Sequence, residues 1–302
     1  MSTSFKGTLM TVIAGIAWGL SGVSGQYLMA HGFSAIILTN IRLLISGAVI
    51  LFAYLSDKEK FFAFLKDKSS YLSLILFAFL GLLLTQLTYL IAIAETNAGT
   101  ATVLQYVCPV GVLAYTCVKD RVGPTVSEIA SMLLAIGGTF LIATHGQLHQ
   151  LAITPKGLGW GLFSAFAYAL YIILPLNLIK KWGSMSVIGV GMLLPGILMV
   201  PFSGLVSFQG HYSSDNFLAL FGLIVLGTIF AYTAFLKGTS MVGAVKGSLL
   251  ASIEPISAVF FAYLIMNDQF YAIDFIGMGM ILLAVLLISL KDLIIQKEKG
   301  IL

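Results

Sequence analysis

The chain has 302 residues, of which 59% are hydrophobic and only 9% are charged, whereas about a quarter of the residues of a soluble domain are charged. With a mean hydropathy of +1.02, this composition excludes a large soluble catalytic domain and a disordered chain, and it predicts an all-α integral membrane protein. The formal net charge of +4 is too small and too scattered for a nucleic-acid surface.

Ten apolar runs follow one another along the chain, and each has about the 20 residues that a helix needs to cross a bilayer. The first run follows MSTSFKGTLM without a signal-cleavage site, so we expect it to remain as a span. A polar break, HGQLHQLAITPK, divides the runs into two groups of five. The runs lie at about 7 to 29, 35 to 55, 71 to 94, 100 to 118, 126 to 144, 157 to 178, 186 to 208, 216 to 236, 246 to 266 and 271 to 290.

The positive charges of the connecting segments indicate how the chain is oriented. With the N-terminus in the cytoplasm, every Lys and Arg outside the apolar runs lies on the cytoplasmic side, except Lys156. We therefore expect both termini in the cytoplasm. The absence of an organelle signal, a lipidation motif and a glycosylation sequon favours a bacterial cytoplasmic membrane.

The two groups of five runs are similar in sequence. One gapless alignment pairs ATVLQYVCPVGVLAY in the fourth run with KGSLLASIEPISAVF in the ninth, so that Pro109 corresponds to Pro255 and Glu128 to Asp274. Because five is an odd number of spans, the second group must lie upside down relative to the first. We predict ten transmembrane helices arranged as two inverted five-helix repeats, residues 1–146 and 147–302, with Pro109 and Pro255 as hinges.

Three segments resemble the EamA family of the drug/metabolite transporter superfamily: IAWGLSG in the first run, NIRLLIS in the second and SLLASIEPISAVFFAYLIMND in the ninth. The resemblance covers nearly the whole chain and implies an inner-membrane carrier of small metabolites, often an amino acid exporter. It also implies a central cavity lined by spans 1, 3, 4, 6, 8 and 9. The chain departs from the family at Cys108-Pro109, where many relatives carry Glu-Pro, and at Asn267-Asp268, where Gly-Glu is common.

Glu254 is the most informative single residue, because it lies about eight residues into the ninth run, close to the bilayer centre. A carboxylate at that depth costs several kcal/mol unless it faces a cavity, finds a partner or stays protonated. We expect Glu254 to be a proton-coupling group or the anchor for a substrate ammonium. In the alternative, structural role, a protonated carboxyl donates a hydrogen bond to the backbone carbonyl that Pro255 leaves free.

Arg42 is the only basic side chain inside an apolar run. Its long stem allows the guanidinium to reach toward the membrane surface, or it binds a substrate carboxylate, or it pairs with Glu254. We favour a structural role, because spans 2 and 7 lie outside the cavity in the family that the chain resembles.

Aromatic and amide side chains on the cavity-lining spans of that family are the other candidates for the binding site. Residues 17–20 (AWGL) align with residues 167–170 (AYAL), which makes Tyr168 the counterpart of Trp18. Both lie about eleven residues into their runs, so both come near the midplane from opposite directions. Aromatic side chains here can enclose an organic solute by apolar or cation-π contacts, and buried glutamines are candidates for hydrogen bonds in the cavity. The further candidates are Gln86, Tyr89, Gln105, Tyr106, Tyr171 and Tyr232.

The sequence favours a transporter over an enzyme. Gly19-Leu20-Ser21-Gly22 matches the Gly-x-Ser-Gly string of rhomboid-type proteases, but no histidine lies in any apolar run to act as a general base. The chain has no nucleotide-binding motif, and Cys108 and Cys117 fit no metal-ligand spacing. We expect no metal and no cofactor.

These observations predict a secondary transporter that moves a small organic solute, an amino acid or related zwitterion, outward by alternating access. The expected partners are this solute, the lipid bilayer and protons. A purine, an organic cation or a lipophilic drug suits the same residues, and an uncoupled facilitator or channel is a further alternative. The sequence leaves the oligomeric state open.

Overall fold

The structure is a computed structural model that describes residues 3–54, 58–121, 123–145, 152–208, 210, 213–242, 247 and 250–298. All regular elements in these residues are helices, and no strand occurs among them. Helices suit a bilayer because they satisfy their backbone hydrogen bonds within one segment. The predicted all-α class is therefore confirmed for the described residues.

Helices cover the first five predicted runs. They are α1 (Thr3–Ala30), α2 (Ala35–Tyr54), the continuous α4 (Tyr71–Leu76), η2 (Phe77–Leu83) and α5 (Leu84–Glu95), the broken α6 (Ala98–Gln105) and α7 (Cys108–Asp120), and α8 (Val126–Thr144). The short helices α3 (Lys58–Lys66) and η1 (Lys68–Ser70) lie between the second run and the third.

Helices also cover most of the second five runs. They are α9 (Pro155–Ile173) followed by α10 (Leu176–Trp182), α11 (Ser184–Ser203), the continuous α12 (Ser214–Phe221), η4 (Gly222–Phe230) and α13 (Ala231–Val242), α15 (Ile253–Met266), and α16 (Ala272–Glu298). A short turn of helix, η3 (Leu205–Ser207), follows α11.

Eight helical stretches in the described residues are long and apolar enough to cross a membrane. They correspond to the first eight predicted runs. The last two runs appear as shorter apolar helices, Ile253–Met266 and Ala272–Leu287. Eight spans are thus supported by length and composition, and the total of ten stays a prediction.

The third and eighth runs share an unusual helix type. In the third run η2 is π-helical over seven residues, and in the eighth run η4 is π-helical over nine. The π-helix is rare and is found frequently at functional sites. The fourth run is interrupted at Tyr106 and Val107, and in the ninth run a turn at Ser252 precedes α15.

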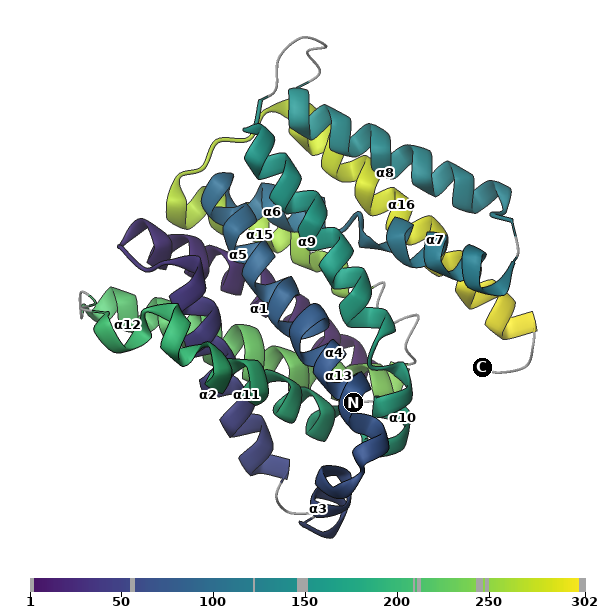
Figure 1. The fold of residues 1–302 in the computed structure, drawn as a ribbon. Coiled ribbons are helices and arrows are strands. Elements are labelled where there is room, and N and C mark those ends of the chain that lie inside the picture. The colour runs from purple at the N-terminus through teal and green to yellow at the C-terminus, as the bar shows by residue number, and fades with distance from the viewer. Residues whose placement is uncertain are drawn as a thin grey trace.

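The packing of the helices pairs elements from the two halves of the chain. Helix α2 packs against α11, and α8 packs against α16. Helix α1 lies against α13 and α15, while α5 and α6 lie against α9. Figure 1 shows α8 and α16 side by side along one edge, with α7 next to them.

Small residues bring several of these helices together. A Cβ on Gly19 of α1 would lie 2.7 Å from the Ala258 nitrogen of α15, so the two backbones are in direct contact. Gly15 lies against α15 in the same way, with Ile253 and Ala251 as its neighbours. These two glycines therefore have a close-packing role, since helices associate in membranes through such small residues.

Carboxylates that correspond in the two halves cap corresponding helices. Glu128 Oε2 accepts from the backbone nitrogen of Thr125 at the start of α8, at 2.6 Å. Asp274 Oδ2 accepts from the backbone nitrogen of Tyr271 at the start of α16, at 2.9 Å, and Asp274 Oδ1 lies 2.6 Å from His145 Nδ1 at the end of α8. The sequence alignment of the two runs thus predicts a shared local structure, the carboxylate of a capping box.

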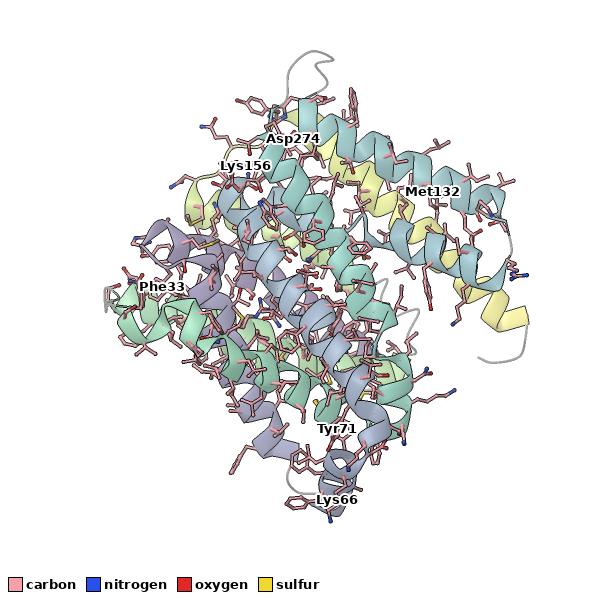
Figure 2. The ribbon with its side chains drawn as sticks, viewed as in Figure 1. Phe33, Lys66, Tyr71, Met132, Lys156 and Asp274 are labelled. Carbon is pink, nitrogen blue, oxygen red and sulfur yellow. The ribbon has the colours of Figure 1, made fainter. Side chains whose placement is uncertain are left out.

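Polar side chains mark the two ends of the molecule. Figure 2 shows Lys156 and Asp274 at one end and Lys66 and Tyr71 at the other. Near the second end, Lys181 Nζ lies 2.6 Å from Asp67 Oδ2. This hydrogen bond, together with those from Ser69 and Ser70, lowers the pKa of the Asp67 carboxyl.

The contact between α8 and α16 gives a test of the packing. A Cβ on Gly277 would lie 2.7 Å from the carbonyl oxygen of Gly138, whereas a Cβ on Gly279 would meet nothing within 4 Å. We expect Gly277→Leu to destabilise the folded protein by about 1–3 kcal/mol through overpacking, seen as a lower midpoint of thermal unfolding in detergent. Gly279→Leu is the matched control, and an equal loss in the two variants would contradict this packing.

Candidate functional site

A cavity of about 160 Å³ lies inside the bundle, and nine of the ten predicted site residues line it. They are Trp18, Arg42, Gln86, Tyr89, Gln105, Tyr168, Tyr171, Tyr232 and Glu254. The tenth, Tyr106, contacts Glu254 instead. Sequence reasoning missed Ser21, Thr85 and Phe235, which line the same cavity. The volume is below the roughly 300–1,000 Å³ of drug-sized sites, so it fits a small metabolite.

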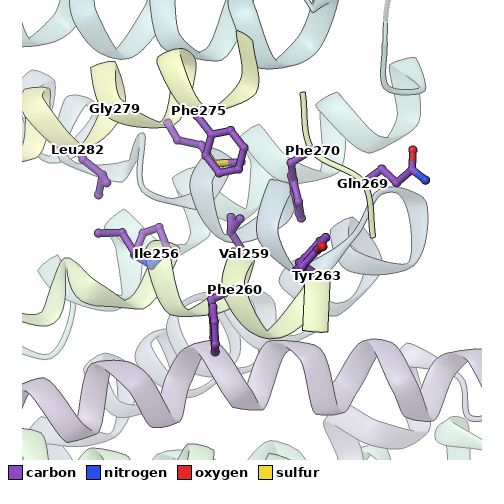
Figure 3. Close-up of a pocket in the computed structure, with 11 residues that line it drawn as sticks. Ile256, Val259, Phe260, Tyr263, Gln269, Phe270, Phe275, Gly279 and Leu282 are labelled. Carbon is purple, nitrogen blue, oxygen red and sulfur yellow. The ribbon is translucent and has the colours of Figure 1, made fainter. Parts of the chain in front are cut away.

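A larger cavity, of about 730 Å³, lies between α15 and α16. Figure 3 shows Phe260 and Tyr263 of α15 and Phe275 of α16 around it. These three side chains are more than half exposed, and the described residues that line the cavity carry no charge. It is an open apolar groove, and the buried polar cavity is the better candidate for a site that recognises a metabolite.

Glu254 is held in the polar cavity by the hydroxyl of Tyr106. Tyr106 Oη lies 3.0 Å from Glu254 Oε2 and 3.1 Å from the carbonyl oxygen of Ala251. That carbonyl lacks its helical donor because the residue four positions later is Pro255, which has no N–H. Tyr106, rather than Glu254, therefore contacts the carbonyl that Pro255 leaves free, in contrast to the structural role considered for Glu254.

The Tyr106 hydroxyl can support Glu254 in both of its protonation states. A hydroxyl donates one hydrogen bond and accepts others. When Glu254 is ionised, the Tyr106 hydroxyl donates to its carboxylate. When Glu254 is protonated, the Glu254 carboxyl donates to the Tyr106 oxygen, and the Tyr106 hydroxyl donates to the carbonyl of Ala251. Glu254 can thus take up or release a proton without losing its hydrogen bond.

The helix breaks place these groups. Tyr106 follows the last residue of α6, and Pro109 then stands in the first turn of α7. Pro255 stands in the first turn of α15, next to Glu254. Proline is tolerated in a first turn because the N–H groups there generally have no intrahelical partner; at Pro255 the one carbonyl that loses a donor, that of Ala251, is contacted by Tyr106 instead. A helix N-terminus stabilises a nearby negative charge. The hinge role of Pro109 and Pro255 stays a prediction.

Arg42 faces the cavity, so the expectation that span 2 stays outside it is wrong for this side chain. Arg42 is only 6% exposed. Its Nε donates to Thr228 Oγ1 at 2.6 Å, and its Nη2 lies 3.5 Å from the carbonyl oxygen of Gly227. The depth of Arg42 within its apolar run already indicated a position facing the cavity. The prediction of a structural role came instead from the family resemblance, in which span 2 lies outside the cavity.

The aromatic candidates form a connected row along the cavity. Trp18 and Tyr232 meet edge to face with ring centroids 5.5 Å apart, and Tyr232 meets Tyr171 in the same way at 6.4 Å. Tyr171 stacks on Tyr168 at 5.7 Å. Trp18 and Tyr168 therefore line one cavity, as predicted, and the other two rings link them.

The two glutamines of the cavity differ in their partners. Gln105 Nε2 donates to Ser164 Oγ at 2.6 Å. Gln86 is 4% exposed, and neither its Oε1 nor its Nε2 has a hydrogen-bond partner among the described residues. Thr85 Oγ1, beside it, is also buried without a partner. Buried polar atoms are nearly always hydrogen-bonded, so this part of the cavity is incomplete without a ligand or water.

Gln26 of α1, which is outside the set of residues that line the cavity, joins the ends of neighbouring helices. Its Nε2 donates to Asp268 Oδ2 at 2.8 Å, and its Oε1 accepts from the backbone nitrogen of Ala98 at 2.7 Å. These bonds connect the ends of three helices, α1, α6 and α15. The cavity is also lined by apolar side chains from α10, α11 and α13, namely Ile179, Ile188 and Leu236.

Comparisons with known proteins agree with one family. The profile of the EamA-like transporter family matches residues 5–144 and again residues 155–290. A Salmonella typhimurium protein named "uncharacterized inner membrane transporter YicL" is 37% identical over 293 residues, which cover 97% of this chain and 98% of the relative. The "uncharacterized transporter YcbK" of Bacillus subtilis is 23% identical over 65% of each chain.

A solved crystal structure has a similar fold. It superposes with a TM-score of 0.63 at 15% sequence identity, over 94% of this chain and 96% of the other. At that identity the similarity shows the fold alone.

The contact between Tyr106 and Glu254 can be tested by a double-mutant cycle. We expect Tyr106→Phe to lower the free energy of unfolding by about 1–3 kcal/mol, because it leaves the Glu254 carboxyl and the Ala251 carbonyl without their hydrogen-bond partner. In a Glu254→Leu background the same change removes only the bond to Ala251, so it should cost less there. The double variant should lose less than the sum, with a coupling of about 0.5–3 kcal/mol. Thermal or denaturant unfolding in detergent measures all four proteins, and strictly additive losses would show that the two side chains do not interact.

Proposed function

The chain belongs to the EamA-like transporter family, and from that premise we propose that it moves amino acids or related small zwitterions out of the cell by proton-coupled alternating access. The family membership confirms the resemblance noted in the sequence and makes the chain a transporter rather than an enzyme. We place it in the bacterial inner membrane, as the name of its Salmonella relative states for that protein.

The observation that carries the proposal is the position of Glu254. An ionisable group inside a membrane-spanning region is by default a candidate for a transport or proton pathway. Glu254 lines a buried cavity together with Arg42, and it can keep a hydrogen bond to Tyr106 in either protonation state. A carboxyl with these properties suits alternate binding of a proton and a substrate ammonium.

Alternating access is supported by the correspondence between the halves. The family profile matches once in each half, π-helical segments occur in the third and eighth runs, and breaks occur in the fourth and ninth. Such paired interruptions surround the substrate site of inverted-repeat transporters. We propose that residues 1–146 and 147–302 are these repeats, with both termini in the cytoplasm.

The cavity is proposed to be in its inward-facing state. The hydrogen bonds of Gln26 to Asp268 and Ala98 lie at the end that the charge distribution assigns to the outside, because Thr96, two residues before Ala98, adjoins Gly157, the residue after Lys156. Release of these bonds would be part of opening outward. Export is proposed from the family resemblance.

The aromatic row favours a second candidate solute. Four adjoining rings, from Trp18 to Tyr168, suit an organic cation or a purine through cation-π or stacking contacts. An uncoupled facilitator with the same cavity is the other alternative. Solute screening decides between these functions.

The central experiment is solute-dependent proton movement in proteoliposomes that contain a pH dye, with amino acids, quaternary amines and purines as the solutes. We expect an amino acid to move protons with the wild type. In Glu254→Gln the proton signal should disappear, because the amide cannot exchange a proton, and transport should lose its pH dependence. Glu95→Gln, at the end of α5 and outside the cavity-lining set, is the control.

Two results would contradict the proposal. If Glu254→Gln keeps both the transport rate and its pH dependence, the role of Glu254 is wrong. If labelled solute enters without proton movement in the wild type, the protein is a facilitator.

A further inference from the structure

We propose that Arg42, Gln86 and Thr85 form a carboxylate subsite, which makes a free carboxylate the feature that the solute must have. The inference rests on the proposed transport function and names the chemical group that this part of the cavity recognises. All three residues line the same cavity, and two elements, α2 and α5, supply them.

The first observation is a buried positive charge without a carboxylate in direct contact. No carboxylate of the described residues lies within 4.0 Å of an Arg42 nitrogen. The ion pairs in the described part of the chain join other residues, His145 with Asp274 and Lys181 with Asp67. Thr228 and Gly227 accept from Nε and Nη2, and both are uncharged acceptors. Glu254 lines the same cavity but forms no salt bridge with Arg42. A buried charge is costly without a hydrogen-bonded opposite charge, and an anionic solute in contact with the guanidinium would supply one.

The second observation is independent of the charge. The whole amide of Gln86 and the hydroxyl of Thr85 are buried without hydrogen-bond partners in the described part of the chain. Other threonines in these helices behave differently: Thr39 and Thr88 each donate to the carbonyl four residues earlier. Thr85 Oγ1 and Gln86 Nε2 thus remain as donors beside the cavity, which is the arrangement that an oxyanion needs.

The donors and the partner of Arg42 lie in or next to the two π-helical segments. Thr85 and Gln86 stand in the first turn of α5, after Leu84, which follows η2. Thr228 lies within η4, where its hydroxyl donates to the carbonyl of Leu223, five residues earlier, at 3.0 Å, and is free to accept from Arg42. Helix α2, which carries Arg42, packs against both η4 and α5, so that η4 orients the guanidinium and α5 presents the free donors.

The charge count of the cavity selects the kind of anion. Arg42 and Glu254 are the charged residues among those that line it. A monoanionic carboxylate matches one guanidinium in the planar geometry that arginine prefers, whereas a phosphate carries a second negative charge for which the lining offers no second cation. A carboxylate at Arg42 and an ammonium at Glu254 balance the cavity, and the remainder of the solute faces the aromatic row.

The test compares solutes that differ only in the carboxylate. Binding of the free amino acids and of their methyl esters to the purified protein is measured by titration, with thermal stabilisation as a second readout. We expect at least one free amino acid to bind the wild type at least tenfold more tightly than its methyl ester, which keeps the ammonium and the side chain. N-acetylated amino acids, which keep the carboxylate and lose the ammonium, report on Glu254 separately.

The decisive variant is Gln86→Met. We expect it to weaken binding of the free amino acid about tenfold and to leave the unfolding midpoint of the unliganded protein unchanged or raised, because the amide has no partner to lose. The matched substitution Gln105→Met should lower that midpoint, because it removes the bond to Ser164. Arg42→Lys keeps the charge but not the planar fork, and it should also bind the free acid at least tenfold more weakly.

The outcomes separate the two proposals. Equal binding of acid and ester, or unchanged affinity in Gln86→Met, overturns the carboxylate subsite alone. Transport of a quaternary amine or a purine, but of no carboxylate solute, also overturns the subsite and leaves a transporter. Failure of the wild type to bind or carry any solute of the panel contradicts both proposals.

Discussion

One hydroxyl, Tyr106 Oη, lies between the carboxyl of Glu254 and the backbone carbonyl of Ala251 that has lost its helical donor. The polar groups at the centre of the structure depend on this hydroxyl for their hydrogen bonds. In a membrane interior an unsatisfied polar group costs several kcal/mol, so each break in a helix must be compensated. Pro255 frees the carbonyl of Ala251, and Tyr106 contacts both that carbonyl and Glu254. Because Tyr106 stands at the break of the fourth run, the two broken helices of the two halves meet at this hydroxyl.

The two halves have corresponding shapes but different chemistry. The break in the ninth run carries Glu254 before its proline, whereas the aligned position in the fourth run is Cys108. The cavity is therefore lined by one acid and one base, and its walls are asymmetric even though the helices correspond. A similar division occurs in the π-helical segments, since η2 leads to the free donors Thr85 and Gln86, and η4 holds the partner of Arg42.

The sequence predicted the helices and most of the cavity because both follow from simple rules. Apolar runs of about 20 residues give helices, and α8 occupies the predicted residues 126 to 144. Polar and aromatic residues in such runs need a cavity, which is where Glu254, Gln86 and Trp18 lie. The bounds differ more where a helix breaks, as between α6 and α7.

Other features depend on contacts between distant residues and were not accessible from the sequence. The partner that draws Arg42 into the cavity is Thr228, on a helix far away in the chain. The π-helical segments leave no pattern that hydropathy detects, and Thr85 differs from other threonines only in lacking its usual backbone acceptor. Ser21 is similar, because its hydroxyl bonds the carbonyl of Leu223 in η4.

In the proposed transporter, the solute group that binds at Glu254 and the one that binds at Arg42 determine whether a proton is exchanged for the solute or carried with it. Linkage is reciprocal, so a solute group that binds more tightly to ionised Glu254 also promotes release of the Glu254 proton. A substrate ammonium at Glu254 does so, and a proton then leaves the site as the substrate enters, which is exchange. A lone carboxylate at the same place would act in the opposite sense and bring a proton with it. Arg42 decides between these cases, because a zwitterion whose carboxylate it binds has its ammonium free for Glu254. In the proposed mechanism, exchange of this kind lets protons that flow inward drive a zwitterion outward. Separate positions for the two charged residues would then make the proposed export and proton coupling compatible in one small cavity.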